Sequence, residues 1–124
     1  MLKLLWIGMA GLFGTLARYG MSGYIDRRIG ETFPAGTLAV NLTGCFLAGF
    51  IYHLTEERFL VDPVLRTALL VGFMGGLTTF SSYGLQTITL LKDGELWLAA
   101  VNVLVSNLAG LILVWAGYTF AKIW

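Results

Sequence analysis

The sequence predicts an all-α membrane protein with four transmembrane helices, the third of which is broken in mid-membrane. Hydrophobic residues make up 57% of the 124 residues and charged residues 12%, about half the charged fraction of a soluble domain. A helix that crosses a bilayer needs roughly 20 apolar residues. Four segments qualify: Leu4–Tyr24, Pro34–Thr55, Pro63–Leu91 and Leu96–Ala121. We expect them to form a single domain over residues 1–124.

The connections between these segments are short and carry almost all of the charges. They are Asp26–Glu31, Glu56–Arg58 and Lys92–Glu95. Two prolines, Pro34 and Pro63, suit a first helical turn, where a missing N–H costs nothing. Asp62 is a good N-cap for the helix that begins at Pro63. The pattern therefore predicts where the second and third helices begin.

Composition disfavours several function classes. A net charge of +1 gives no particular attraction to nucleic acid. The single Cys45 cannot form an intrachain disulfide, and with His53 as the sole histidine a zinc site has too few ligands. We interpret Cys45 as a packing residue and His53, close to Glu56, as interfacial. We predict no catalytic residue and hence no enzyme.

The stretch Gly72–Gly84 is unlike a lipid-facing helix. Gly75 and Gly76 lower the helix propensity, and the hydroxyls of Thr78 and Thr79 can take up backbone groups that a break sets free. We therefore predict a break over Gly75–Thr78. Unwound carbonyl groups at mid-membrane depth are a cation site in several transporter folds.

Rings and hydroxyls directly after this break indicate an ion path. Phe80 and Tyr83 are three residues apart and share a helix face, Thr79 precedes Tyr83 by four residues, and Ser82 adds another hydroxyl. Aromatic residues at helical spacing usually belong to a core, which is one interpretation. The other is a pore wall for an anion, because the edges of aromatic rings are electropositive.

Amides and hydroxyls in the second and fourth segments extend the candidate path. Asn41 shares its face with Gly44, Cys45 and Ala48, so that face is narrow and can lie against a helix or a pore. The amide then either bonds a neighbouring helix, as amides in lipid usually do, or donates to an anion. In the fourth segment, Ser106 and Asn107 are candidates for the same path.

Arg18 stands inside the first segment, where a cation is costly. It lies four residues after Gly14 and therefore on the same helix face. Its long side chain can reach the interface, or it can attract anions to a vestibule. The two roles are compatible.

The flanking charges scarcely orient the chain. Lys3, Arg58, Arg66 and Lys122 fall on the side of the N-terminus, and Arg27, Arg28 and Lys92 fall on the other side. Positive charge on the cytoplasmic side normally sets topology, and four charges against three give almost no bias. Either the orientation is unique but weakly set, or the chain inserts both ways and pairs as an antiparallel dimer. Four short helices that enclose a water-filled path would retain little packing among themselves, which also favours a homo-oligomer.

Three motifs resemble the Fluc/CrcB fluoride channel family, and the resemblance covers the whole chain. They are Gly11-x-x-Gly14-x-x-x-Arg18-Tyr19, Gly36-Thr37-Leu38-x-Val40-Asn41-x-x-Gly44 and Gly72-Phe73-x-Gly75-Gly76-Leu77-Thr78-Thr79-Phe80-Ser81. The resemblance implies an antiparallel, dual-topology homodimer in the bacterial inner membrane, with two pores through which fluoride passively leaves the cytoplasm. It also implies a structural Na⁺ at the dimer centre.

The family's site residues map onto this chain by position. The resemblance implies that the backbone carbonyls of Gly75 and Thr78 from both subunits hold the Na⁺. Its pore asparagine matches Asn41, and its two pore phenylalanines match Phe80 and Tyr83. Tyr83 is a departure, since the family usually has phenylalanine there.

The main rival is a small dual-topology multidrug exporter that exchanges protons for drug. Such an exporter needs an acidic residue within the membrane. No carboxylate lies within Leu4–Tyr24 or deep in the other segments, so the sequence favours passive flow of an anion. A second rival is a non-transporting membrane subunit, for which small glycine faces would suffice.

Overall fold

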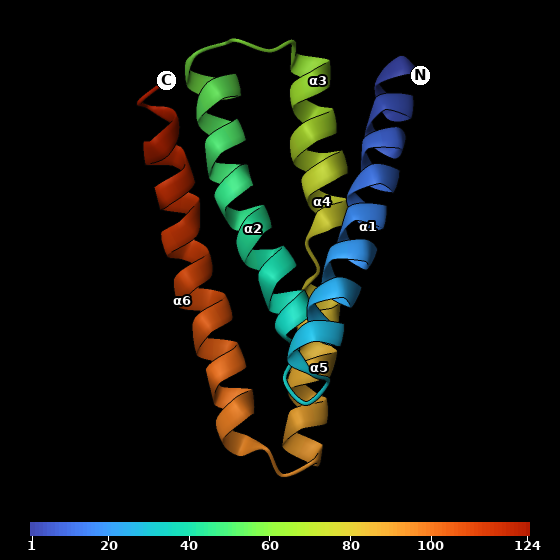
Figure 1. The fold of residues 1–124 in the computed structure, drawn as a ribbon. Coiled ribbons are helices and arrows are strands. Elements are labelled where there is room, and N and C mark those ends of the chain that lie inside the picture. The colour runs from blue at the N-terminus through green and yellow to red at the C-terminus, as the bar shows by residue number, and fades with distance from the viewer.

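The computed structural model describes all 124 residues, and every regular element is helical. The chain crosses back and forth between two ends, with both termini at the same end (Figure 1). The elements are α1 (Leu2–Ile29), α2 (Ala35–Tyr52), the π-helical turn η1 (His53–Glu57), α3 (Pro63–Thr67), the π-helical η2 (Ala68–Phe73), α4 (Met74–Leu77), α5 (Phe80–Lys92) and α6 (Leu96–Ala121).

Three of the four predicted spans are both long and apolar enough to cross a membrane. They are Ala35–Glu57, Pro63–Lys92 and Leu96–Ala121. The 28-residue α1 has the length but falls short in hydropathy, because Arg18 and Tyr19 interrupt its apolar run. The all-helical fold is confirmed, and the expectation of four apolar spans is met by three, with α1 packed beside them.

The predicted helix starts are close to the observed ones. Asp62 Oδ1 accepts a hydrogen bond from the Val64 N–H at 2.8 Å, and Pro63 is the first residue of α3. Pro34, in contrast, lies one residue before α2 as its N-cap. The second helix also ends in a wider π-helical turn rather than at Thr55.

The break in the third span is real, but its position differs from the prediction. Gly75 and Gly76 remain helical within α4, and the chain is extended at Thr78 (ψ 156°) and Thr79 (φ −149°, ψ 118°). The Thr78 N–H still bonds the Met74 carbonyl at 3.0 Å. The helix therefore stops after the glycines, at the first N–H that a side chain from another helix captures.

Glycines allow the helices to approach one another closely, as small residues do in membrane bundles. A Cβ added at Gly14 of α1 would collide with the Phe73 carbonyl group. One added at Gly117 of α6 would collide with the Phe46 carbonyl of α2. The first contact holds α1 against η2 and α4, and the second holds α2 against α6. Gly8 in α1, by contrast, has open space around it.

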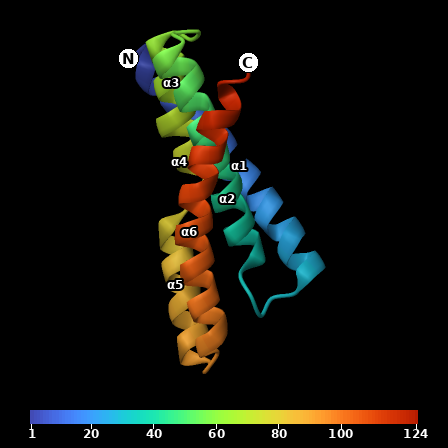
Figure 2. The ribbon, with the colours of Figure 1, turned by 90° about the vertical axis from the view of Figure 1, so that its left-hand side faces the viewer.

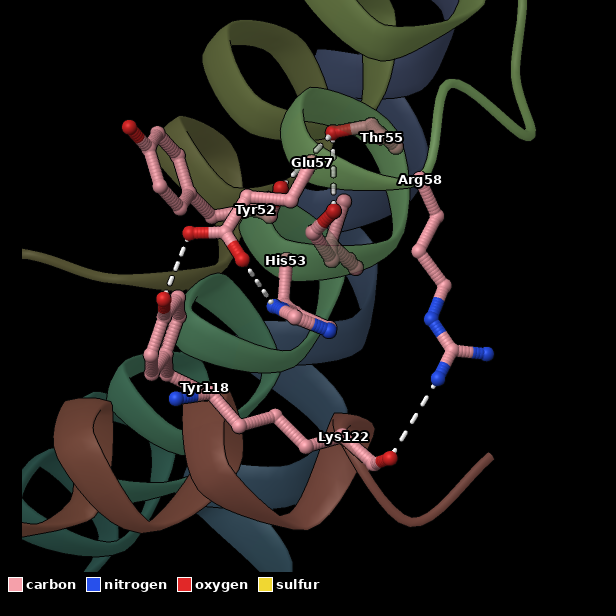
Figure 3. A network of polar contacts seen from close by, with 8 residues as sticks. Tyr52, His53, Thr55, Glu57, Arg58, Tyr118 and Lys122 are labelled. Atoms are coloured by element: carbon pink, nitrogen blue, oxygen red, sulfur yellow. Dashed lines mark hydrogen bonds and ion pairs between the residues drawn. The ribbon is translucent and has the colours of Figure 1, made fainter.

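A polar cluster fastens the end of α2 to the end of α6 (Figure 3). His53 Nδ1 lies 2.9 Å from Glu57 Oε2, and the Tyr118 hydroxyl donates to the other oxygen of Glu57. The His53 side chain is 7% exposed, and its carboxylate partner is Glu57, one turn on, rather than the nearby Glu56. Glu56 pairs instead with Arg66.

At the opposite end the molecule opens into two hairpins. The α1–α2 connection and the α5–α6 connection diverge there (Figure 2). α5 stays beside α6 through Asn102, which is 2% exposed and donates to Thr87 Oγ1 at 3.0 Å. The broken span thus packs against α1 and α2 before the break and against α6 after it.

Candidate site: a polar groove at the helix break

A groove of about 330 Å³ lies beside the break, between α2, α4, α5 and α6. Its lining contains no charged side chain. The polar lining residues are Asn41, Thr78, Thr79, Tyr83, Ser106 and Asn107, and the others are Gly44, Cys45, Ala48, Met74, Phe80 and Val114. The break follows 15 residues after Pro63 and precedes Lys92 by a similar length, so the groove lies at mid-span.

The groove brings together most of the side chains that the sequence singles out. Asn41, Thr79, Phe80, Tyr83, Ser106 and Asn107 all line it. Ser82 does not, and instead its N–H and hydroxyl both lie 3.1 Å from Thr79 Oγ1. Thr79 thereby caps α5. Arg18 is half-buried in α1 and is not part of the lining.

Asn41 holds the break from the neighbouring helix. Its Oδ1 accepts from the Thr79 N–H at 2.7 Å, and its Nδ2 donates to the Thr79 carbonyl at 3.0 Å. The interhelical hydrogen bond expected of an amide in lipid is therefore present. An amide nitrogen carries two hydrogens, and the second has no acceptor in the chain. The two roles considered for Asn41 are thus compatible.

Phe80 and Tyr83 form the aromatic part of the groove. Their ring centroids are 5.4 Å apart with planes tilted by 49°. Phe80 is 82% exposed, so its ring packs little against its own chain. Phe80 is the first residue of α5. At this end of a helix, unpaired backbone N–H groups and the helix dipole favour negative charge.

Two hydroxyl groups in the groove have a hydrogen to donate. Ser106 Oγ is buried and has no hydrogen-bond partner. The Tyr83 hydroxyl accepts from Asn107 Nδ2 at 3.2 Å and donates to no group of the chain. A buried hydroxyl without a partner is costly, so the Ser106 position invites an acceptor.

Carbonyl groups at the end of α4 are likewise without partners. The Gly75 carbonyl accepts no hydrogen bond, because its helical donor, the Thr79 N–H, is bonded to Asn41. The Thr78 carbonyl accepts none either, because the Ser82 N–H is bonded to Thr79 Oγ1. Gly75 is exposed, and no side chain lies within 4 Å of where its Cβ would be.

Comparison with known proteins assigns the chain to a family. Residues 5–118 match the family model described as CrcB-like protein, Camphor Resistance (CrcB). The chain belongs to the CrcB family.

Several relatives in the CrcB family match over almost their full length. The chain is 46% identical over 122 residues to the fluoride-specific ion channel FluC of Geotalea daltonii, with 98% of each chain covered. It is 45% identical to the protein of the same name from Nitrosococcus oceani, covering 98% of this chain and 97% of that one. The Salinibacter ruber protein, also named fluoride-specific ion channel FluC, is 46% identical over 94% of this chain and 87% of its own.

Some lining residues were not expected from the sequence of this CrcB chain. Met74 and Val114 are ordinary apolar residues that carry no local signal. Thr78 was expected to contribute its carbonyl, whereas its side chain also faces the groove, where a Cβ on Gly44 would collide with it. The small face around Asn41 was the available signal, and its residues Gly44, Cys45 and Ala48 line the groove.

A larger cavity of about 600 Å³ lies between the diverging hairpins. Asp26, Glu31, Asp93 and Glu95 are among its lining residues, together with Gln86. Four carboxylates repel an anion. Gln86, three residues after Tyr83, lines this acidic cavity and not the groove. We therefore assign the candidate anion site to the smaller groove.

Proposed function

We propose that this protein is a fluoride-specific ion channel through which fluoride passively leaves the cytoplasm, which relieves its toxicity. The observation that carries the proposal is the groove at the break, which lies at mid-span, holds no charge and presents hydrogen-bond donors without partners. The names of its relatives support the same function. An ion channel is not an enzyme.

The groove suits fluoride for physical reasons. Fluoride is small and strongly hydrated, so a pore must replace its water with donors. The second Asn41 N–H and the Ser106 hydroxyl supply such donors, and the Phe80 ring supplies an electropositive edge.

Proton-coupled drug export has no support from the groove. An exporter of that kind needs a carboxylate that binds and releases protons within the membrane. No lining residue is acidic. Passive flow of an anion needs no such group.

Arg18 would act outside the groove. It is half-buried in α1 and makes no ion pair within the chain. A cation without a partner raises the local electrostatic potential. We assign to Arg18 the attraction of anions toward the entrance of the path.

A second copy of the chain would complete the pore. Phe80, Gly75 and Asn107 are exposed on the single chain. The carbonyl and amide groups at these positions cannot face hydrocarbon without cost, because lipid offers no hydrogen bonds. A homodimer covers them, and the near balance of flanking charges favours antiparallel subunits that insert in both orientations.

The carbonyls at the end of α4 fit a sodium ion. The Gly75 and Thr78 oxygens accept no hydrogen bond, and Na⁺ takes neutral oxygen ligands of this kind. Two subunits would offer four such oxygens at their shared axis. The ion would supply a structural link between the subunits and no step in conduction.

Fluoride flux from liposomes tests the proposed function. Purified protein in vesicles without a proton gradient should release fluoride at least a hundredfold faster than chloride. Fluoride release that requires a proton gradient, or chloride release at the same rate, would contradict the channel. Multi-pass insertion in a bacterial inner membrane is the setting that this activity requires.

Two further measurements test the assembly. A tag on each terminus should react with a membrane-impermeant label from both sides of the membrane. Labelling from one side would rule out dual insertion. Thermal unfolding should occur at a higher temperature in Na⁺ than in N-methyl-glucamine at equal ionic strength. Equal unfolding temperatures would exclude the sodium site.

A further inference from the structure

A hydrogen bond links the two pore-lining helices inside the groove. Asn107 of α6 places its Nδ2 3.2 Å from the Tyr83 hydroxyl of α5. The same nitrogen lies 2.8 Å from the Val103 carbonyl, one turn back in α6. Asn107 and Tyr83 both line the groove.

The contact with Val103 fixes which end of the amide faces the tyrosine. A backbone carbonyl can only accept, so the amide atom beside it must be the nitrogen. That nitrogen has two hydrogens. One points to the Val103 carbonyl, and the other to Tyr83. The oxygen of the tyrosine is therefore the acceptor in this bond.

The tyrosine hydroxyl keeps its own hydrogen as a consequence. No side chain or carbonyl of the chain accepts it. A hydroxyl that accepts a hydrogen bond becomes a stronger donor, because the two bonds polarise one another. The Tyr83 O–H thus stands in the groove as a donor near Ser106, whose buried hydroxyl also has no partner.

We propose that the Tyr83 hydroxyl is a fluoride ligand and that Asn107 is the positioning residue that turns it into a donor. This inference rests on the proposed function and adds a binding contact to the pore. Fluoride is the halide that accepts hydrogen bonds most strongly, so an oriented O–H favours it over chloride. Both hydrogens of the Asn107 amide are already bonded, one to the Val103 carbonyl and one to the Tyr83 hydroxyl. Asn107 therefore does not itself donate to the ion.

The test is a double-mutant cycle on fluoride flux in liposomes. The four proteins are the unaltered chain, Tyr83→Phe, Asn107→Leu and the double variant, each measured over a range of fluoride concentrations. Tyr83→Phe keeps the ring and the maximum flux, and it should raise the half-saturating fluoride concentration by roughly 12- to 160-fold, as expected for loss of one hydrogen bond to a charged group. Asn107→Leu should shift it in the same direction by a smaller factor. The double variant should match Tyr83→Phe.

A matched control separates binding from packing. Thr87→Val removes another polar contact between α5 and α6, the bond from Asn102, outside the groove, together with the bond from the Thr87 hydroxyl to the Tyr83 backbone carbonyl one turn back. It should lower the unfolding temperature and leave the half-saturating concentration unchanged. A merely structural Asn107 would resemble this control.

Each outcome decides the inference. An unchanged half-saturating concentration in Tyr83→Phe would show that the hydroxyl is no ligand. An added shift from Asn107→Leu in the Tyr83→Phe background would show that Asn107 does not act through the tyrosine. Either result leaves the unaltered protein a selective channel, whereas absence of selective fluoride flux in the unaltered protein overturns the proposed function and this inference together.

Discussion

The amide of Asn41 bonds both backbone groups of Thr79, a residue 38 positions away in the sequence. Its Oδ1 accepts from the Thr79 N–H, which would otherwise bond the Gly75 carbonyl and continue α4. Its Nδ2 donates to the Thr79 carbonyl. One side chain of α2 therefore sets the position of the break in the third span. The groove forms around this contact, with the unpaired end of α4 on one side and the start of α5 on the other.

Asn41→Ala should destabilise the protein and reduce fluoride flux. The substitution leaves the Thr79 N–H and carbonyl without partners, at a cost of roughly 1–3 kcal/mol for each buried group. Thermal unfolding in detergent measures the first effect and liposome flux the second. Thr43→Ala is the control, because Thr43 lies on the same helix as Asn41 and its side chain makes no hydrogen bond. Equal unfolding temperatures for the two variants would contradict the role of Asn41.

Phe80→Ile should nearly abolish fluoride flux without unfolding the protein. The ring is 82% exposed on the chain and makes its aromatic contact with Tyr83 alone. Isoleucine keeps an apolar side chain but removes the electropositive ring edge that an anion contacts.

The matched control is Leu85→Ile on the same helix. Leu85 is 70% exposed and lies outside the groove, so this substitution should leave flux unchanged. Size-exclusion chromatography of both variants checks their assembly. Full flux through Phe80→Ile would make Phe80 a packing residue.

Local sequence signals were sufficient to predict the helices and most of the polar residues of the groove, although Ser82 lies outside it. Apolar length and the charged connections gave the spans, and the small face around Asn41 indicated a narrow polar path. The residues that line the groove come from α2, α4, α5 and α6. An amide or hydroxyl in an apolar run indicated the polar residues Asn41, Thr79 and Ser106, whereas Met74 and Val114 carry no such signal.

The partners of those polar groups could not be predicted from the sequence. Gly75 and Gly76 have low helix propensity, yet they stay helical, because packing overrides propensity and the break is set by a side chain on another helix. The partner of His53 is Glu57, one turn on, and the bond from Tyr118 of α6 to Glu57 has no signal in the local sequence. The Asn41–Thr79 and Tyr118–Glu57 contacts join different elements, which periodicity does not encode.

Gly14→Ala should lower stability, whereas Gly8→Ala should not. A Cβ at Gly14 meets the backbone carbonyl of Phe73, which cannot move without shifting η2. Such overpacking costs typically 1–3 kcal/mol. A Cβ at Gly8 meets open space, and alanine is the better helix former by about 1 kcal/mol. Unfolding temperatures in detergent compare the two variants, and a decrease for Gly8→Ala as large as that for Gly14→Ala would contradict the packing of α1.

The bond between Asn102 and Thr87 should stabilise the pairing of α5 with α6. Asn102 is 2% exposed and its Nδ2 lies 3.0 Å from Thr87 Oγ1. Hydrogen bonds between membrane helices contribute about 0.6 kcal/mol on average and up to about 1.7 kcal/mol. Thr87→Val leaves the buried amide with an unpaired N–H, and Asn102→Leu removes the amide itself.

A double-mutant cycle of these two substitutions isolates the bond. The unfolding free energies of Thr87→Val, Asn102→Leu and the double variant should show a coupling of about 0.5–1.5 kcal/mol. The selectivity for fluoride over chloride should stay unchanged in every variant, because neither residue lines the groove. A coupling near zero would mean that apolar packing alone joins the two helices, and altered selectivity would extend the pore to this pair.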